Sequence, residues 1–569
     1  MFDTDVLIVG AGPVGSAAAV EVVRRGVRCR IIDAQSDPPQ YAKAVGIQPR
    51  TLELFEAMGI LREVLDAGIR LRGQLGYVNG AEAGRMDLAL PPEIPFGFLG
   101  LPQYETERIL RRHLASLGTR VERGVRLVGF TQDEDGVDAV LAGPEGERTV
   151  RARYLVGCDG AHSTVRKALG LTFEGAAFTE QYMLGDVELD WSQPHGYTVR
   201  STHQTNGGAD DVLVCVPLPG HHRYRVSMRL PPQLQTDPAD GGDKVEHGLG
   251  TGPGPRLADI QAVLDRLAPE PVTASRLRWS SVFRISHRIV DSYSRGRVFV
   301  AGDAAHIHPP TGAQGMNTGI QDAWNLAWKL ALAVAGVAAP SLLASYDAER
   351  RPIGEEVVSR TVRDAREGIG ADEPDPERLL LREAQLLIDY RDSPIVTESP
   401  TGAPSPTAGS RAPDAIGLSR DGVTSPFRLF PLLAGPDHTL LWYVGNTGDA
   451  AALAGIERHV DLLRKLTYDH LDAYLVASPG ATVDPTVLPV IRDGDGDFAR
   501  RYHCAAGAAY IVRPDGYLGY AASPAAPDDL IRHVESTFAP ETVVRTTSVL
   551  PRHLRTGEDA GATARFPAP

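Results

Sequence analysis

A glycine-rich turn constrains this chain more than any other feature of its sequence. The turn is Gly10-Ala11-Gly12-Pro13-Val14-Gly15, and it lies between the apolar run 5–9 and an apolar-periodic stretch that ends near Arg25. A second predicted strand, 27–32, comes next. The pattern predicts a strand–helix–strand unit, the start of a nucleotide-binding α/β sheet.

The three glycines of this turn have separate physical roles. Gly10 permits a tight turn, Gly12 lets the backbone approach a pyrophosphate, and Gly15 lets the helix pack closely on the strand. The start of the helix offers unpaired N–H groups to phosphates. Asp33 and the adjacent Ala34 close the second strand, where the carboxylate can accept hydrogen bonds from ribose hydroxyls. The motif therefore predicts a dinucleotide site but leaves NAD and FAD both open.

A second segment favours FAD. The predicted strand 297–301 ends in Gly302-Asp303, and a glycine-rich stretch leads from there into a long helix predicted over about 318–334. An aspartate at a strand end can bind the ribityl hydroxyls of a flavin, and the positive end of a helix stabilises the charge of a reduced flavin. The residues assigned to the cofactor here are Gly302, Asp303, Pro310, Gly312, Gly315, Met316 and Asn317.

A third segment, Cys158-Asp159-Gly160-Ala161-His162-Ser163-Thr164-Val165-Arg166, also follows a predicted strand. Asp159 could bind the cofactor or could hold Arg166 and the local turn, and the sequence leaves both open. His306 and His308 form an HxH pair, but no third ligand is near in sequence, so no metal site is expected.

Composition excludes several classes of protein. A chain of 569 residues exceeds the roughly 250–300 residues of a single core, so two to four domains are expected. The formal net charge of −14 argues against nucleic acid or an anionic membrane as the main partner. Four scattered cysteines without a CxxC pair suit a reducing, cytoplasmic compartment. No targeting or membrane-spanning segment is expected, because the apolar stretches are interrupted or too short.

The glycine turn with Asp33, the CDGAHSTVR segment and AGDAAHIHPPTGAQGMN together resemble the signature segments of the single-component FAD-dependent aromatic hydroxylases. This family includes para-hydroxybenzoate hydroxylase and phenol hydroxylase, and the resemblance covers roughly residues 1–380. The C-terminal extension, with GAAYIVRPDGYLGY, resembles the thioredoxin-like tail of longer members, notably the aromatic-polyketide hydroxylases of antibiotic pathways.

The resemblance implies an α/β fold, in which a Rossmann-like FAD-binding domain carries an inserted, mostly antiparallel β substrate domain and is followed by a thioredoxin-like α/β domain. Alternating apolar segments between Tyr182 and Phe283 are typical of such a sheet, and a Pro-, Ser-, Thr- and Gly-rich stretch indicates a linker. The expected division is an FAD-binding domain at 1–180 and 285–385, a substrate domain at 181–284, a linker at 386–412, a C-terminal domain at 413–550 and a tail at 551–569.

The resemblance also assigns roles to single residues. Lys43 and Arg50 would lie near the ribose and phosphates of FAD, although the family usually has Arg at the first position. Gln103 would contact the ribityl chain.

Catalytic candidates are Pro310, expected at the reacting edge of the flavin, and Arg284, which precedes the strand that ends in Gly302-Asp303. Met316 and Asn317 would offer backbone N–H groups to the flavin carbonyl.

The activity implied by the resemblance is hydroxylation of a phenolic or polycyclic polyketide substrate with NAD(P)H and O2, through a flavin C4a-hydroperoxide. Baeyer–Villiger insertion, epoxidation and oxidative decarboxylation remain alternatives, and so does a non-catalytic flavin-bound sensor or partner-binding protein. No second GxGxxG unit is present, so NAD(P)H is expected to bind transiently as a co-substrate. The partners expected are a small aromatic substrate and O2, and the chain is expected to be a monomer or homodimer.

Overall fold

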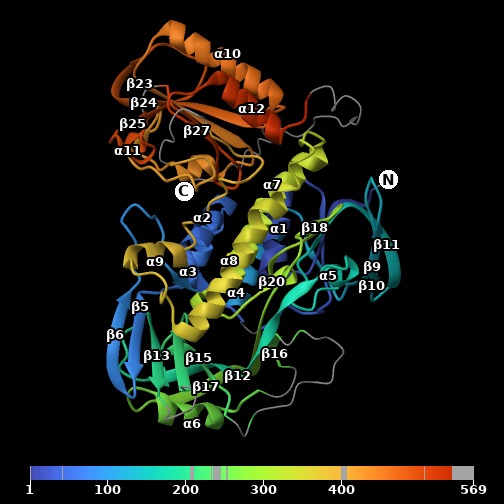
Figure 1. Ribbon diagram of the computed structural model, residues 1–569, viewed down its shortest axis with the longest axis vertical. Coiled ribbons are helices and arrows are strands. Elements are labelled where there is room, and N and C mark those ends of the chain that lie inside the picture. The colour runs from blue at the N-terminus through green and yellow to red at the C-terminus, as the bar shows by residue number, and fades with distance from the viewer. Residues whose placement is uncertain are drawn as a thin grey trace, which may run out of the picture.

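A computed structural model describes residues 2–40, 43–204, 211–231, 234, 245, 247–250, 254–398, 406–504 and 507–540. The predicted tail at 551–569, the end of the predicted C-terminal domain and part of the predicted linker lie outside these residues. Figure 1 shows three units, with the C-terminal unit at the top, a sheet at the bottom and the N-terminal unit between them. Among the described helices, none has the length and apolar character needed to cross a membrane.

Parallel strands form the sheet of the N-terminal unit. β1 (Thr4–Val9) is fully buried and pairs in parallel with β2 (Cys29–Asp33) on one side and β11 (Gly146–Gly157) on the other. The strand order is β18-β19-β11-β1-β2-β8, and β10 and β9 extend β11 as antiparallel neighbours. The bounds of these outer strands are β8 (Val121–Arg123), β9 (Arg126–Gln132), β10 (Val137–Gly143), β18 (Ser294–Arg295) and β19 (Val298–Val300).

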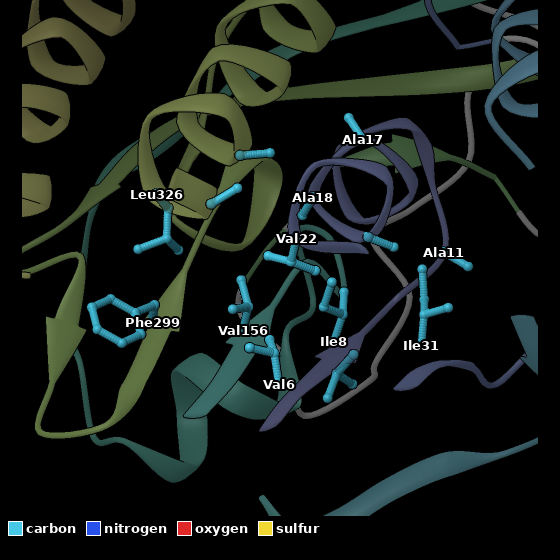
Figure 2. Close-up of a cluster of buried hydrophobic side chains, with 14 of the residues drawn as sticks. Val6, Ile8, Ala11, Ala17, Ala18, Val22, Ile31, Val156, Phe299 and Leu326 are labelled. Atoms are coloured by element: carbon cyan, nitrogen blue, oxygen red, sulfur yellow. The ribbon is translucent and has the colours of Figure 1, made fainter. Parts of the chain in front are cut away.

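Two helices that pack together cover one face of this sheet. They are α1 (Pro13–Arg24), which begins directly after the glycine turn, and α7 (Gly315–Ala335). Figure 2 shows Val22 of α1 against Ile8 and Val6 of β1 and Val156 of β11. The predicted strand, helix and second strand at the start of the chain are therefore confirmed.

The other elements of the N-terminal unit surround this core. The strands β3, β7 and β4 form a small separate sheet, and β20 pairs with the middle sheet. Their bounds, with those of the helices, are β3 (Gly46–Ile47), α2 (Pro49–Met58), α3 (Leu61–Ala67), β4 (Ile69–Arg70), β7 (Leu99–Gly100), α4 (Gln103–Ser116), α5 (Thr164–Ala168), η2 (Gly302–Ala304), β20 (His306–Ile307), η3 (Thr311–Ala313), α8 (Ser345–Glu367) and α9 (Pro376–Glu383).

The middle sheet has nine strands in the order β16-β17-β12-β15-β14-β13-β5-β6, with β20 beside β17. Its strands from the predicted substrate region are β12 (Phe173–Asp190), β13 (Tyr197–His203), β14 (Asp211–Pro217), β15 (Arg223–Arg229), β16 (Gly248–Leu249) and β17 (Thr273–Val290). The helix α6 (Leu257–Leu267) packs on one face.

Two further strands of this sheet, β5 (Gly73–Val78) and β6 (Ala81–Asp87), come from a stretch that sequence analysis assigned to the FAD-binding domain. β5 pairs in parallel with β13, more than one hundred residues later, and a pairing of that range leaves no local sequence pattern.

The C-terminal unit contains a seven-stranded sheet in the order β21-β27-β26-β23-β24-β25-β22. The parallel strands β23 (His438–Gly448) and β24 (Leu471–Val483) are joined by α10 (Ala450–Leu466), and the antiparallel pair β26 (Ala509–Val512) and β27 (Leu518–Ala522) is followed by α12 (Pro527–Thr537). The remaining elements are β21 (Thr397–Glu398), β22 (Leu418–Ser419), η4 (Phe430–Ala434), β25 (Val490–Asp493) and α11 (Asp497–Arg501).

The described parts of the predicted linker are packed against both large units. The Ser393 hydroxyl donates to Glu349 of α8 at 2.6 Å, and the Arg411 guanidinium pairs with Glu53 of α2, both in the N-terminal unit. The Gly409 N–H donates to the Leu518 carbonyl of the C-terminal unit at 2.7 Å. Linker composition indicates little secondary structure, but it gives no information on such contacts. The C-terminal unit is therefore held to the N-terminal unit along this segment.

Candidate active site

The glycine turn has the two close contacts and the one open space that a bound pyrophosphate would require. Gly10 has φ +98°, and a Cβ there would lie 2.3 Å from the carbonyl oxygen of Cys158. A Cβ on Gly15 would lie 1.9 Å from the carbonyl oxygen of Gly10, whereas a Cβ on Gly12 would meet nothing within 4 Å. Gly10 and Gly15 are thus needed for packing, while Gly12 leaves space in front of α1.

The N-terminus of α1 fits the phosphates of a dinucleotide. No side chain caps it, Pro13 occupies its first turn, and that turn holds no acidic residue. Its backbone N–H groups and the positive end of the helix dipole are therefore available to an anion in the space beside Gly12. Pro13 fixes the direction of the chain at this point.

Asp33 lies where the sequence predicted it, at the end of β2, beside the exposed Ala34. One carboxylate oxygen accepts from the Ala11 N–H at 2.8 Å and the other accepts from the Gln35 N–H at 2.9 Å. Arg123 lies 3.4 Å away. Each carboxylate oxygen has a second lone pair, so Asp33 can hold the turn and still accept a ribose hydroxyl.

The Gly302-Asp303 turn packs directly on the glycine turn. Gly302 has φ +61°, and a Cβ there would lie 2.8 Å from a methyl group of Val14. A Cβ on Gly319 of α7 would lie 2.6 Å from the same methyl group. Val14, predicted to bind cofactor, therefore joins the two motifs, and two segments almost 300 residues apart form one site.

Asp303 is paired with Lys43. The Lys43 Nζ lies 2.6 Å from Asp303 Oδ2 and 3.0 Å from Nε2 of His247. Burial alone would raise the pKa of Asp303, but the Lys43 ammonium and His247 outweigh it and hold this pKa well below its usual range. Asp303 is therefore an ionised acceptor, the form that binds hydroxyl donors such as those of a ribityl chain.

Gln103 fixes the segment that carries Lys43. Its backbone N–H donates to the Ala44 carbonyl at 3.0 Å, and its side-chain oxygen accepts from the Ala44 N–H at 3.1 Å. Its amide nitrogen donates to Glu107 at 2.8 Å. Gln103, at the start of α4, thus holds Lys43 near Asp303.

The second helix start, at α7, is also uncapped and free of acidic residues. Gly315, Met316 and Asn317 supply its first N–H groups, because the first backbone bond runs from the Thr318 N–H to the Gln314 carbonyl at 2.9 Å.

The loop before α7 is held by Gln48 and Asn317. The Gln48 side chain donates to the Gly312 carbonyl at 2.7 Å, and the Asn317 side chain accepts from the Gln48 N–H at 2.9 Å. Gly312 has φ +68°, and Pro310 lies exposed at the start of this loop. The loop is therefore fixed from behind by Asn317, which the sequence motif included, and by Gln48, which it did not.

Asp159 caps a helix. Its carboxylate accepts from the Ser163 hydroxyl at 2.5 Å and from the Thr164 and Val165 N–H groups at 2.7 and 3.2 Å, at the start of α5. Arg166 does not pair with it but donates to the carbonyls of Ala161 and Ala304. This segment therefore supports the Gly302-Asp303 turn from behind.

Two predicted residues are not brought to this site. Arg50 is buried, lies 2.7 Å from Glu53, donates to the Asp515 carbonyl at 2.7 Å and stacks over Tyr517, so it belongs to the contact with the C-terminal unit. A Cβ on Gly185 would lie 2.6 Å from Ile260 of α6, and Gly185 pairs with Ser280 of β17. Arg284 follows Ser280 at an even spacing, so it points to the same face of the sheet as α6. The contacts of Arg50 and the position of Arg284 do not support the roles predicted for them.

A buried charge network behind the Gly302-Asp303 turn escaped sequence analysis. Asp322 of α7 accepts from the Gly302 N–H at 3.1 Å, lies 2.8 Å from His306 Nε2 and pairs with Arg350 of α8 at 2.8 Å. All three side chains are at most 1% exposed. The only available signal was helical spacing, which does not distinguish a buried Asp from a surface one.

His308 lies at the start of α7. Its Nδ1 is 2.9 Å from the Pro309 carbonyl, its Nε2 is buried without a partner, and a Cβ on Gly315 would lie 3.4 Å from this Nε2. Burial, with His306 nearby, lowers the pKa of His308 to about 4, so the ring is neutral.

Comparison with known proteins identifies the family. The FAD binding domain family matches residues 3–361. A flavin-dependent monooxygenase of Mycobacteroides abscessus is 34% identical over 525 residues, which are 90% of this chain and 96% of the relative. The 6-methylpretetramide 4-monooxygenase of Streptomyces rimosus is 32% identical over 540 residues, 90% of each chain.

Among solved structures, aklavinone-11 hydroxylase in a ternary complex with FAD and aklavinone superposes with a TM-score of 0.75 at 26% identity, covering 94% of this chain and 99% of that one. The family match and the two relatives, added to the dinucleotide geometry at α1 and α7, identify this chain as a member of the single-component FAD-dependent monooxygenases.

Proposed function

We propose that this enzyme hydroxylates a phenolic or polycyclic polyketide ring with NAD(P)H and O2. The observation that carries the proposal is that two helix N-termini without a side-chain cap, those of α1 and α7, both belong to segments that pack on the turn that holds Asp303. The named relatives include 6-methylpretetramide 4-monooxygenase, pentachlorophenol 4-monooxygenase and anhydrotetracycline monooxygenase. Those names all describe oxygenation of an aromatic or polycyclic compound.

When bound, FAD supplies a hydride acceptor and a means of activating O2. The α1 start and Gly12 would bind its pyrophosphate, Asp33 its ribose, and Asp303, held by Lys43, its ribityl hydroxyls. The N-terminus of α7 would stabilise negative charge on the reduced ring. Pro310 and Gly312 would cover the reacting edge and keep water away, because a dry site favours oxygen transfer over release of peroxide.

We also propose that the C-terminal unit is thioredoxin-like in fold and does not take part in redox chemistry. Its β23-α10-β24 segment, followed by β26, β27 and α12, has the order and strand directions of that fold. Cys504 is its one cysteine, and burial raises the pKa of this thiol to about 12. A neutral single thiol cannot carry out the disulfide exchange of a thioredoxin.

The test is consumption of NADPH and NADH by FAD-loaded enzyme against a panel of phenols and hydroxylated polycyclic quinones, with product mass and NMR. Substrate-stimulated oxidation with a new ring hydroxyl is expected. If the product were a ring-expanded ester or an epoxide, the reaction would be Baeyer–Villiger insertion or epoxidation instead of hydroxylation. Absence of any substrate-stimulated oxidation across the panel would contradict the proposal.

A further inference from the structure

One face of the middle sheet carries a buried cluster of charged and aromatic side chains. The other face is covered by α6, since a Cβ on Gly185 would lie 2.6 Å from Ile260 of that helix. Side chains alternate along a strand, so Asp186 points away from α6. Arg225 of β15 and Trp279 of β17 are its partners in the strand register and lie on the same side.

This face is turned toward Asp303. Phe283 follows Trp279 at an even spacing on β17, so it lies on the same face. The ring of His247 packs edge-on against Phe283, with centroids 5.7 Å apart, and Nε2 of His247 is 3.0 Å from the Nζ of Lys43. Lys43 in turn is paired with Asp303. Contacts therefore run from the candidate flavin site to this face.

A second contact leads to the same conclusion. Arg223, two residues before Arg225 on β15, donates to the Tyr104 hydroxyl at 2.9 Å. Tyr104 lies in the first turn of α4, next to Gln103, which holds the segment of Lys43. Two sets of contacts, one from Phe283 and one from Arg223, thus lead from this face of the sheet to the segment of Lys43.

Arg225 has a buried donor without an acceptor. Its Nε donates to Asp186 Oδ1 at 2.5 Å, and the two residues are only 4% and 2% exposed. Its Nη2 is buried and has no hydrogen-bond partner, and the guanidinium lies 5.1 Å from the Trp279 ring. A buried donor without a partner costs free energy, so an oxygen placed here would be bound.

The charges of the cluster favour an anionic oxygen. Arg223 also lies 3.5 Å from Asp186, so two guanidinium groups share one carboxylate. These three groups together carry one net positive charge, and the Trp279 ring lies beside Arg225. An aromatic ring that bears a negative oxygen matches both features.

We propose that Arg225 is a substrate-binding residue that holds an ionised oxygen of the aromatic substrate, a phenolate or enolate. This inference rests on the proposed function and extends it, because an ionised ring is richer in electrons and accepts oxygen at carbon more readily. An opposite charge within about 4–6 Å lowers the pKa of a carboxyl or phenol by about 1–3 units, and the proton passes to solvent.

The experiment uses enzyme loaded with oxidised FAD, without NAD(P)H, and two probes: a hydroxyanthraquinone and an anthraquinone carboxylate that lacks hydroxyl groups. Visible absorbance gives the pKa of the bound hydroxyanthraquinone, and titration gives both affinities. We expect the wild type to lower that pKa by about one unit or more. Arg225→Gln should abolish this shift and weaken binding of the ionised probe about tenfold or more.

The matched control is Arg229→Gln. Arg229 lies on the same strand and face, but it is one-third exposed and 3.7 Å from Glu180. This variant should leave the pKa shift and the affinity unchanged.

A second variant separates substrate binding from a structural ion pair. Asp186→Asn removes the carboxylate that competes for Arg225, so it should lower the pKa of the bound probe further. If the ion pair between Arg225 and Asp186 were purely structural, both variants would lose the pKa shift and the affinity for the probe. That result would overturn the proposal. If Arg225→Gln loses FAD or folded structure, the double variant Asp186→Asn with Arg225→Gln removes both partners of the buried ion pair, leaves Arg223 with the Tyr104 hydroxyl, and should still lack the shift.

Three other results would also overturn the inference. They are a wild-type pKa shift retained in an FAD-loaded Arg225→Gln variant, tight binding of the carboxylate probe without any phenol shift, and failure of the wild type to bind either probe. Failure of the proposed function would be seen separately, as a wild type that binds the hydroxyanthraquinone but shows no substrate-stimulated NAD(P)H oxidation.

Discussion

Glu349 of α8 and Arg513 of the C-terminal unit form an ion pair with two hydrogen bonds, of 2.7 and 2.8 Å, in which each side chain is 1% exposed. The Lys329 ammonium lies 2.7 Å from the same carboxylate. Burial would raise the pKa of Glu349, but Arg513 and Lys329 hold it well below its usual range. The pair joins two units that the sequence separates by more than 100 residues.

Removing one partner of this pair should destabilise the whole protein. Arg513→Met leaves the Glu349 charge with incomplete compensation in a buried place, and such changes cost about 3–5 kcal/mol. Urea unfolding should show this loss. Arg532→Met is a matched control, because Arg532 is 64% exposed beside Asp529, and it should change stability by less than about 0.5 kcal/mol. Equal stability of the two variants would contradict the role given to Arg513.

Gly12 and Gly15 should respond differently to alanine. A Cβ on Gly12, whose φ is −68°, meets nothing within 4 Å, so Gly12→Ala should fold normally but occupy the space for the pyrophosphate. Its affinity for FAD should fall at least about tenfold. In Gly15→Ala the Cβ clashes with the Gly10 carbonyl, so the FAD-free protein itself should lose stability. Thermal unfolding of apoprotein and FAD titration measure the two effects, and unchanged FAD affinity in Gly12→Ala would contradict the assignment.

Asp303→Ala should weaken FAD binding far more than Asp159→Ala. A hydrogen bond to a charged group contributes about 1.5–3 kcal/mol, or roughly ten- to a hundredfold in affinity. Asp159 caps α5, so its loss should instead lower stability by about 0.5–2 kcal/mol. Titration of both apoproteins with FAD tests this ranking of the two variants. Equal losses of FAD affinity would contradict it.

Stability should fall as the pH drops below about 6.5. Burial lowers the pKa of His308 to about 4 and, with Arg513 nearby, that of His533 to about 3. In the unfolded chain a histidine has a pKa of about 6.5, so only the unfolded state gains protons just below that pH. Their contribution is complete above about pH 6.5 and is lost progressively toward the folded pKa values, at about 1.4 kcal/mol per pH unit for each histidine.

His533→Gln tests this dependence. Between about pH 6 and 4.5 the slope of unfolding free energy against pH should be shallower than in the wild type by about 1.4 kcal/mol per unit. Above pH 7 the two curves should run parallel. An identical slope in urea unfolding at low pH would show that His533 does not titrate as described.

Gly315→Val should uncouple oxidation from hydroxylation. A Cβ at Gly315 makes an ordinary contact with His308, so Gly315→Ala should behave nearly as the wild type, but valine would crowd His308 at the start of α7. A misplacement near 1 Å can cost about a hundredfold in an orientation-dependent step. With FAD fully bound, product should fall more than NAD(P)H consumption, and hydrogen peroxide should rise. Equal losses of product and consumption would place Gly315 away from the reacting edge.

The parts of the fold that sequence analysis predicted depend on local pattern. The strand 5–9, the helix after Pro13 and the long helix before Val334 have clear apolar periodicity, and the structure confirms them, with α7 beginning three residues earlier than expected. The roles of the glycines at positions 10, 12 and 15 were predicted from the glycine-rich motif between a predicted strand and a predicted helix, and the clashes and the open space found there agree with those roles.

The parts that sequence analysis did not predict depend on contacts between distant residues. Asp322 sits beneath the Gly302-Asp303 turn because α7 packs there, and nothing in its neighbours indicates burial. Arg50 matched a family position, but Glu53 and the Asp515 carbonyl bind its guanidinium in the contact between units. The side of the sheet to which Arg284 points depends on strand register, which the sequence does not fix.

Exchange of C-terminal regions between relatives of this enzyme would have to respect the buried network of Glu349. The incoming region must supply a cation at position 513 and an acceptor at position 515, which in this chain takes the Trp328 indole N–H at 3.1 Å. A hybrid that lacked them would leave Lys329 and Glu349 facing a mismatched surface, and Lys329 lies in the second half of α7, whose first turn lies at the candidate flavin site. Compatibility at these few positions, rather than overall similarity, should decide which hybrids fold and still hold their cofactor.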